Sequence, residues 1–559
     1  MLTGVMRMAA GLRRRLMLTY RVRRRLVDLA VSSQGRHPSL RRLVPTGVSR
    51  LADAGVDREV TRHRTQFVVA RQQDVVRMWH LAAQTADRVA AALTHSGVEF
   101  FAMHRPFTRT ARWAVRRDEL ADLAHALANT LGPEAFYYQF DRASPTRLVR
   151  EGLRQEELTS IEHFRIFQYV RCQITGTLYA ASCSCDIAIW DEAVERDTLV
   201  APDRDSVVQE VDNNPLHLET RTRWDGRPEP ILAGTGGDAA SIEFPVDAVY
   251  LWVDDSDPRW RERRARVLSE TGQNGADSAD ETVSAHRFRD RGELRASLRS
   301  LEMYAPWIRR IYLVTDDQRP GWLAADNGRV KVVDHREIFS DPSVLPSFNS
   351  HAIESQIHRI PGLADHYLLM NDDVMFNRPV TPYNFFTPTG ALRVTFSRAR
   401  RPDTSRDQQT PLEQARLNSA ELLSRAHGRR ASLLFGHVPF PQRKDIAIEV
   451  EERYQEEILT TLRSPFRAPT DVVVNSWLHL YTALFTGRGF ASPLRYGYFN
   501  IGSSEVRARM EEQRYINRFQ VICLNDVPPP PGEPDADPAW LSEWLAWNFP
   551  IPTPFETRH

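Results

Sequence analysis

The sequence predicts a mixed α/β protein whose second half is built on a mainly parallel sheet. After about residue 244, β-branched and aromatic runs alternate with helical patterns, which is typical of parallel strands joined by crossover helices. Before that point, a different mixture of strands and helices ends at a glycine-rich stretch, residues 233–243, with the composition of a linker. We therefore expect two α/β domains, the first smaller than the second.

Length and composition agree with this class. A chain of 559 residues is too long for one ordinary core. Hydrophobic residues make up 42% of it and charged residues 26%, which excludes an intrinsically disordered protein. The net charge is only +1, and we expect no nucleic-acid partner. The four cysteines show neither a paired zinc spacing nor a disulfide framework, so reduced thiols in the cytoplasm are expected: Cys172, Cys183, Cys185 and Cys523.

Residues 1–60 are predicted to be a basic N-terminal arm. Eight arginines precede the first acidic residue, Asp28, and apolar residues such as Leu12 and Leu16 lie between them. Two readings are equally favoured, an amphipathic helix on an anionic membrane surface and a solvated arm. The sequence has no apolar signal-peptide region and no run of about 18 to 20 apolar residues. Any contact with the inner face of the membrane is therefore expected to be peripheral.

Residues 61–232 are predicted to be an accessory α/β domain. Residues 64–96 have a broad apolar face at helical spacing, and 118–132 form a second expected helix. Between and after them, residues 97–104, 112–117, 135–140 and 185–192 have the composition of strands.

In the second half, the expected strands come in a regular order with helices. Strands are predicted from residue 245 to Asp254, over 309–317, over 329–335 and from His366, with helices over 293–308 and 349–360. The carboxyl ends of parallel strands meet at one edge of a sheet, where ligands bind. Asp254, Asp316 and Asp373 are therefore expected along the same edge.

One of these strands ends in an unusual way. In "HYLLMNDDVMF", Asn371, Asp372 and Asp373 lie between two apolar runs. Adjacent carboxylates repel each other and lose solvation on burial, so we expect a cation at this position. Carboxylate oxygens suit Mg²⁺ or Mn²⁺, which is often completed by substrate phosphates. For Asp254 and Asp316 the simpler reading, that aspartate starts a loop, remains open.

Several segments together resemble the Stealth family. They are "FPVDAVYLWVDDSDPRW", "RFRDRGELRASLRSLEMYAPWIRRIYLVTDD", "NSHAIESQIHRIPGLADHYLLMNDDVMF", "FRAPTDVVVNSWLHLYTALFTGRG" and "VICLND". This family includes bacterial capsular and exopolysaccharide phosphotransferases and the animal lysosomal-enzyme N-acetylglucosamine-1-phosphotransferase. The resemblance implies a Stealth-type phosphotransferase domain over 244–527, with a nucleotide-sugar-binding fold similar to GT-A and Rossmann folds. It also implies a helical insertion over about 403–431 and leaves a Pro/Trp-rich tail over 528–559, expected to pack on the body of the protein.

The resemblance also implies site residues. Active-site positions of the family match Glu354, Asp373, His437 and Arg467 of this sequence, and Asp372 and Asp373 are the expected metal ligands. Asp255 stands where the family pattern usually has glycine, which puts in doubt how closely this loop approaches a nucleotide. Positions expected to bind substrate are Trp252, Asp254, Asp257, Asp290, Glu293 and Arg295.

The implied activity is transfer of a sugar 1-phosphate from a nucleotide-sugar donor to a hydroxyl of a polysaccharide or oligosaccharide acceptor, with Mg²⁺ or Mn²⁺. Arg467 would bind phosphate oxygens. His437 would act as a base or as a nucleophile, and Glu354 as a second base or a support for the metal. Two alternatives remain: a metal-dependent glycosyltransferase of polysaccharide synthesis, and a non-catalytic polysaccharide-assembly protein.

Overall fold

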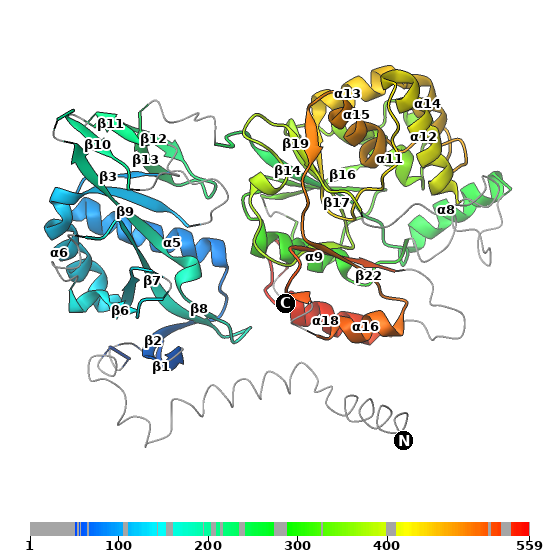
Figure 1. The fold of residues 1–559 in the computed structure, drawn as a ribbon. Helices are drawn as coiled ribbons and strands as arrows, with labels where there is room; N and C mark the ends of the chain where they lie inside the picture. Colours follow the sequence, from blue (N-terminus) through cyan, green and yellow to red (C-terminus); the bar gives the residue numbers. More distant parts are fainter. Residues whose placement is uncertain are drawn as a thin grey trace, which may run out of the picture. The chain divides into compact units, whose positions relative to one another are not determined.

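The computed structural model describes residues 51–557 except for short segments: 53–54, 56, 64–65, 104–109, 142, 153–159, 194, 203–207, 213–215, 234–240, 273–287, 326–327, 398–409, 513–515 and 527–537. The chain divides into two compact units, Met1–Asp238 and Ala239–His559 (Figure 1). The predicted linker and the first fifty residues of the basic arm lie largely outside the described residues. Among the helices that are described, none has the length and apolar character needed to cross a membrane.

The first unit is a mixed sheet with two long helices, α5 (Met78–His95) and α6 (Leu120–Leu131). Leu93 and Leu127 of these helices share a core with Ile166 and Ile187 of the sheet. The strands are β1 (Arg58–His63), β2 (Gln66–Gln73), β3 (Phe100–Ala102), β4 (Arg112–Arg116), β5 (Phe136–Gln139), β6 (Arg147–Leu148), β7 (His163–Cys172), β8 (Leu178–Tyr179), β9 (Cys185–Ala193), β10 (Thr198–Val200) and β11 (Glu210–Asp212), followed by the hairpin β12 (Leu218–Thr222) and β13 (Pro228–Leu232).

One prediction for this unit is wrong. A helix was expected over 64–96, but the helix begins only at Met78, and Gln66–Gln73 forms strand β2. This strand pairs with β1 on one side and with β7 on the other. Pairing with a strand about a hundred residues away overrides the local helical pattern, because strand formation depends on such tertiary neighbours.

The second unit is centred on a mainly parallel sheet, as predicted. Its strand order is β16-β15-β14-β17-β20, and only β20 runs antiparallel to its neighbour. The strands are β14 (Val246–Leu251), β15 (Ile311–Thr315), β16 (Val330–Asp334), β17 (His366–Asn371) and β20 (Phe440–Arg443). The acids that follow β14, β15 and β17 therefore leave the sheet at the same edge.

Helix α9 (Glu293–Tyr304) belongs to two cores at once. Leu294 and Leu298 pack in the core of the parallel sheet, whereas Ala296 packs in a separate core with Met375 and Trp544. That second core lies on a smaller sheet with the order β18-β23-β22, made of β18 (Val374–Phe376), β22 (Tyr496–Asn500) and β23 (Val521–Asn525).

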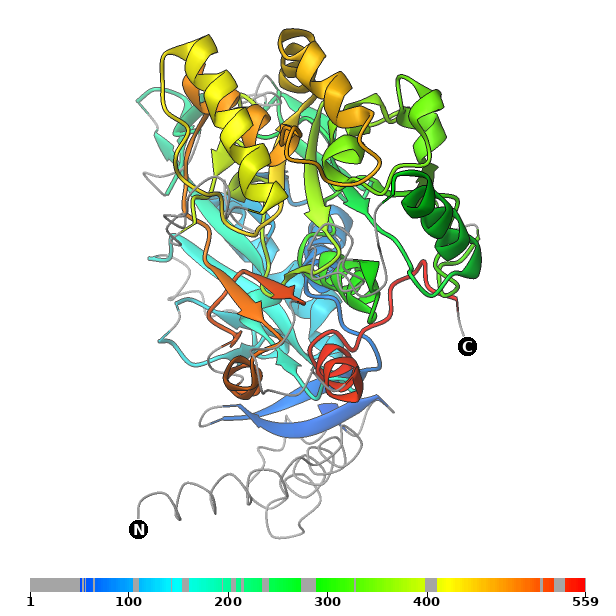
Figure 2. The ribbon, with the colours of Figure 1, turned by 90° about the vertical axis from the view of Figure 1, so that its right-hand side faces the viewer.

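The tail packs on the body of this unit, as predicted. Helix α18 (Pro538–Asn548) lies beside α16 (Ser504–Met510) next to the smaller sheet, as Figures 1 and 2 show. Beyond α18, the carboxylate of Glu556 accepts hydrogen bonds from Arg295 and Arg299 of α9. Apolar contact and ion pairing together thus hold residues 538–557 against α9.

The remaining helices of this unit follow in the order of the sequence. They are α8 (Pro258–Glu270), α10 (His335–Ile338), α11 (Ser350–Gln356), α12 (Pro411–His427), α13 (Lys444–Arg453), α14 (Gln455–Leu462), the π-helix Val474–His479 and α15 (Leu480–Phe485). Two short parallel strands, β19 (Leu392–Val394) and β21 (Gly489–Ala491), complete the unit.

Candidate active site

An acidic pair follows strand β17. Asp372 and Asp373 are partly buried, and the backbone N–H of Asp373 donates to Oδ1 of Asp372 at 3.0 Å. Burial and the charges of Asp373 and Glu293 raise the pKa of Asp372 well above its ordinary value. Burial raises the pKa of Asp373 to about 6. Both carboxyls therefore resist ionisation, and a nearby cation is needed to stabilise the state in which both are charged.

The oxygens of Asp373 differ in their surroundings. Oδ2 accepts a hydrogen bond from the thiol of Cys523 at 3.2 Å, whereas Oδ1 is buried and has no hydrogen-bond partner among the described residues. An unsatisfied buried carboxylate oxygen fits a place in the coordination sphere of Mg²⁺ or Mn²⁺. In the described part of the chain, no group of three or more His, Cys, Asp or Glu residues is arranged to hold a metal. The residues therefore fit an ion held by one or two carboxylates and substrate phosphates, rather than a cage of protein ligands.

A further pair of acids lies at the start of α9. The indole N–H of Trp252 donates to Oδ2 of Asp290 at 2.9 Å, and Gly292 N–H donates to Oδ1 at 2.7 Å. Gly292 has a φ of 95°, a left-handed conformation that favours glycine and that turns the chain into α9. Glu293 follows, 6% exposed, and burial raises its pKa to about 7. The charges of Glu293 and Asp290 both act on Asp372, so these two acids lie within electrostatic range of the acidic pair.

Three predicted substrate-binding residues have other contacts in the structure. Asp257 caps α8 by accepting from Arg259 N–H at 2.9 Å, and Asp254 accepts from Ser256 N–H at 2.8 Å within the preceding turn. The guanidinium of Arg295 donates to Glu556 at 2.6 Å. Substrate binding by Asp254, Asp257 and Arg295 stays a prediction, and each has a local contact that stabilises the fold.

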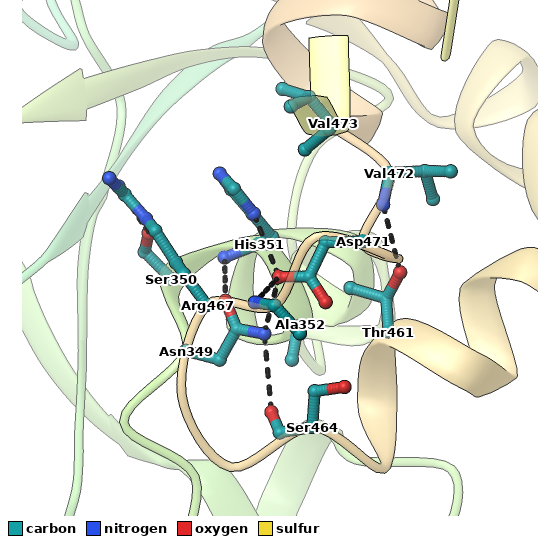
Figure 3. Close-up of polar contacts among 12 residues, drawn as sticks. Asn349, Ser350, His351, Ala352, Thr461, Ser464, Arg467, Asp471, Val472 and Val473 are labelled. Carbon is teal, nitrogen blue, oxygen red and sulfur yellow. Dashed lines mark hydrogen bonds and ion pairs between the residues drawn. The ribbon is translucent and has the colours of Figure 1, made fainter. Parts of the chain in front are cut away.

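A buried carboxylate fixes the loop that carries Arg467. Asp471 is fully buried, and its Oδ2 lies 2.8 Å from Nδ2 of Asn349, 3.0 Å from Nδ1 of His351 and 3.0 Å from the N–H of Ala468 (Figure 3). Asn349 also caps α11, so the loop and the N-terminus of α11 are tied to each other. Arg467 then donates to Oγ of Ser350 at 2.8 and 3.2 Å.

Two arginines act on Glu354. This residue lies on α11, one turn beyond Ser350. Burial raises the pKa of Glu354 to about 7, although the charges of Arg467 and Arg416 both oppose that rise. A carboxyl with a pKa near neutrality, flanked by guanidinium groups, can exchange a proton at physiological pH.

His437 lies in the same neighbourhood. Burial and the charge of Arg416 lower the pKa of His437 to about 4, so its imidazole is neutral at pH 7. The ring of His437 lies 4.7 Å from the ring of Tyr498, centroid to centroid. The charges of Asp373 and Arg416 both act on Tyr498, and the partial burial of its side chain raises its pKa to about 12. The charge of Arg416 acts on Glu354, His437 and Tyr498. The charge of Arg467 acts on Glu354, and that of Asp373 acts on Tyr498, so these predicted site residues lie within electrostatic range of shared neighbours.

Helix α12 contributes a residue that the sequence prediction missed. Arg416 lies on this helix, within the predicted insertion, with its guanidinium 6.0 Å from the ring of Trp477. Asn418 donates to the backbone carbonyls of Pro469 and Asp471, at 2.8 and 3.0 Å. The described part of the insertion is therefore one helix packed on the Arg467 loop. The helical spacing of its buried residues is the signal in the sequence that indicates a packed helix; these residues are Ala415, Ser419, Leu422 and Leu423.

Comparison with known proteins gives a consistent result. Family models match three segments of the chain: Stealth protein CR1, conserved region 1, over 244–272; CR2, conserved region 2, over 287–394; and CR3, conserved region 3, over 436–484. Exopolysaccharide phosphotransferase SCO6023 of Streptomyces coelicolor is 35% identical over 84% of this chain and 81% of its own length. The chain belongs to the Stealth family. Exopolysaccharide phosphotransferase CpsY of Mycobacterium tuberculosis is 33% identical over 79% of this Stealth chain and 82% of its own length.

The Stealth regions cover most of the site. CR1 contains Asp254 and Asp257, and CR2 contains Asp290, Glu293, Glu354, Asp372 and Asp373. His437 and Arg467 lie in CR3, whereas α12 with Arg416 lies between the matched CR2 and CR3 segments. A solved structure of galactosyltransferase LgtC with donor and acceptor sugar analogues aligns with 55% of this chain and 96% of its own, at 12% identity and a TM-score of 0.28. A similarity this low supports no conclusion about fold or function.

Proposed function

We propose that the chain is an exopolysaccharide phosphotransferase that moves a sugar 1-phosphate from a nucleotide-sugar to a hydroxyl of a polysaccharide or oligosaccharide acceptor, releasing a nucleoside monophosphate. The supporting observation is that the acidic pair and two arginines act on shared neighbours: Asp373 and Arg416 on Tyr498, and Arg416 and Arg467 on Glu354. The Stealth relatives that match most of the chain are named exopolysaccharide phosphotransferases. We also propose a nucleotide-sugar-binding fold of the GT-A/Rossmann type for the parallel sheet.

The opposite charges suit phosphoryl transfer. In this reaction negative charge spreads over the phosphoryl oxygens, and a protein accelerates it mainly by positioning and by electrostatic stabilisation. Arg467 and Arg416 would bind those oxygens, since guanidinium stays charged and meets phosphate with paired N–H donors. Asp372 and Asp373 would hold Mg²⁺ or Mn²⁺, which when bound neutralises charge on the diphosphate.

Two roles are open to His437. As a base, its neutral imidazole takes the proton of the acceptor hydroxyl while that oxygen bonds to phosphorus and the bond from phosphorus to the nucleotide oxygen breaks. As a nucleophile, its nitrogen first displaces the nucleoside monophosphate and the acceptor oxygen then displaces the histidine. Both roles need the unprotonated ring that burial and Arg416 favour. In the second case Glu354, with a pKa of about 7, supplies the base.

The leaving nucleotide tests the proposal. The purified protein would be incubated with a panel of nucleotide-sugars, Mg²⁺ and oligosaccharide acceptors, and the released nucleotide identified by chromatography. We expect a nucleoside monophosphate, and we expect its release to be lost in Asp373→Ala and His437→Ala. Release of a nucleoside diphosphate would establish a glycosyltransferase instead. No release of either nucleotide, with oligosaccharide binding retained, would favour an assembly protein.

A further inference from the structure

Strand β22 presents an aromatic ring to solvent beside the site. Its residues alternate, with Gly497 and Phe499 buried against the core that contains α16 and α18, and Tyr498 on the opposite face. Tyr498 is 46% exposed; within the described residues, it and Phe490 are the exposed aromatic side chains of phenylalanine, tyrosine or tryptophan type. An exposed tyrosine ring offers an apolar face and a hydroxyl to a ligand.

Sheet register places Tyr498 next to the acidic pair. Tyr498 is directly paired with Cys523 in the parallel β22–β23 ladder, so their side chains leave the same face of the sheet. The thiol of Cys523 in turn lies 3.2 Å from the carboxylate of Asp373. The ring of Tyr498 thus lies on the side of the smaller sheet that bears the candidate metal ligand.

The loop that carries His437 packs against the same strand. A Cβ atom at Gly436 would lie 2.9 Å from the ring of Tyr496, so glycine permits a contact that a side chain would prevent. Residue 437 follows directly, and its partly buried ring lies 4.7 Å from Tyr498 with the two planes tilted by 49°. The exposed ring and the imidazole therefore line one surface.

The chemistry of this surface suits a sugar. A pyranose has an apolar face of C–H groups and a rim of hydroxyls, so it is recognised by an aromatic ring surrounded by hydrogen-bonding groups. Tyr498 provides the ring, the imidazole of His437 lies beside it, and the carboxylate of Asp373 lies on the same side of the smaller sheet. A lipid surface or a protein partner would instead favour several adjacent exposed apolar side chains.

We propose that Tyr498 is the platform on which a pyranose ring of the acceptor glycan stacks, so that an acceptor hydroxyl faces His437. The assignment of the stacked sugar to the acceptor rests on the proposed function, in which His437 acts on the acceptor hydroxyl. It makes Tyr498 a substrate-binding residue that fixes the acceptor's position, and the donor diphosphate is left to the acids and arginines.

The test compares Tyr498→Ala and Tyr498→Phe with a control, Phe490→Ala, which removes another exposed ring, 40% exposed, on β21. Binding of short malto-, manno- and galacto-oligosaccharides is measured by saturation-transfer NMR with Mg²⁺ and no donor. Steady-state KM values for acceptor and donor are then measured by nucleotide release. We expect Tyr498→Ala to raise the acceptor KM about tenfold and to weaken saturation transfer, with the donor KM unchanged. Tyr498→Phe, which keeps the ring, should raise the acceptor KM much less than Tyr498→Ala, and Phe490→Ala should behave as wild type.

The outcomes separate this proposal from the proposed function. Release of a nucleoside diphosphate overturns the phosphotransferase proposal, whereas the NMR comparison still decides whether Tyr498 binds sugar. A rise in donor KM alone shows that the ring holds the donor sugar and overturns the acceptor assignment. Equal losses in Tyr498→Phe and Tyr498→Ala show that the hydroxyl matters rather than the ring. Unchanged acceptor binding in a folded Tyr498→Ala protein, or no saturation transfer from wild type to any oligosaccharide, overturns the platform.

Discussion

Replacing Asp373 with asparagine is expected to stabilise the metal-free protein while it abolishes activity. Burial raises the pKa of Asp373 from its ordinary value near 4 to about 6. A raised carboxyl pKa means that the folded protein binds this proton more tightly than the unfolded chain does. The stabilising contribution of the protonated carboxyl is complete below about pH 4 and is lost as the pH rises to about 6. Above that pH the folded state carries an unfavourable charge.

The size of the effect follows from this shift. Two pKa units correspond to about 3 kcal/mol, and partial exposure of the side chain reduces this to about 2 to 3 kcal/mol. In a unit of roughly 320 residues, 1 kcal/mol changes the melting temperature by about 1.5 °C. We therefore expect metal-free Asp373→Asn to melt about 3 to 4 °C above wild type at pH 7.5 and at the same temperature as wild type at pH 4.

The assay is thermal unfolding followed by tryptophan fluorescence, in EDTA and in excess Mg²⁺, across this pH range. Mg²⁺ should raise the melting temperature of wild type at pH 7.5 and leave Asp373→Asn unchanged. Asp365→Asn is the matched control, because Asp365 is an exposed aspartate next to the other end of β17. A difference between wild type and Asp373→Asn that is constant with pH would refute the reasoning, as would equal Mg²⁺ effects on both proteins.

Three further results are expected. Arg416→Gln removes a positive charge that lowers the pKa of His437. The acid limb of the pH profile of kcat/KM, expected near pH 4, should therefore move to higher pH. An unchanged acid limb would show that the charge of Arg416 does not influence His437. Asp471→Ala leaves the buried donors of Asn349 and His351 without their acceptor, so the free energy of unfolding should fall by about 3 kcal/mol in urea. Nucleotide release should show that most phosphotransfer is lost as well. Unchanged activity would show that the Arg467 loop needs no anchor. The hydrogen bond from Arg299 lowers the pKa of Glu556 to about 2, although burial of the carboxylate opposes this change. Glu556→Gln should therefore lower the melting temperature at pH 7, and the difference from wild type should shrink as the pH falls from about 4.5 to about 2. A difference independent of pH would show that the ion pair contributes nothing.

The parallel sheet was predictable because its strands carry their own signal. β14 and β15 are short runs rich in β-branched and aromatic residues, and β17 is a short apolar run. Each is bounded by an acid or a loop, and this pattern identifies buried strands without knowledge of their partners. The acidic pair was predictable for a similar reason, since adjacent carboxylates after a buried strand are energetically unusual in any fold. β2 was not predictable in this way, because its strand conformation depends on β1 and β7.

The cationic side of the site was only partly accessible from sequence. Arg467 and His437 came from the family resemblance, and nothing in their local sequence indicates proximity to Asp373. Arg416 and Tyr498 gave no signal, because their place depends on α12 packing against the 467–473 loop and on the register between β22 and β23. Periodicity shows which face of an element is buried, but it does not show which distant element covers that face.

The pairing of Glu556 with α9 has a consequence for biosynthesis. Arg295 and Arg299 lie two and six residues after Glu293, yet their partner is translated more than two hundred and fifty residues later. Strand β23, which brings Cys523 to Asp373, is also among the last segments to leave the ribosome. The nascent chain therefore contains its acidic pair before strand β23 has been made, and α9 gains its ion-pair partner only after translation has passed residue 556.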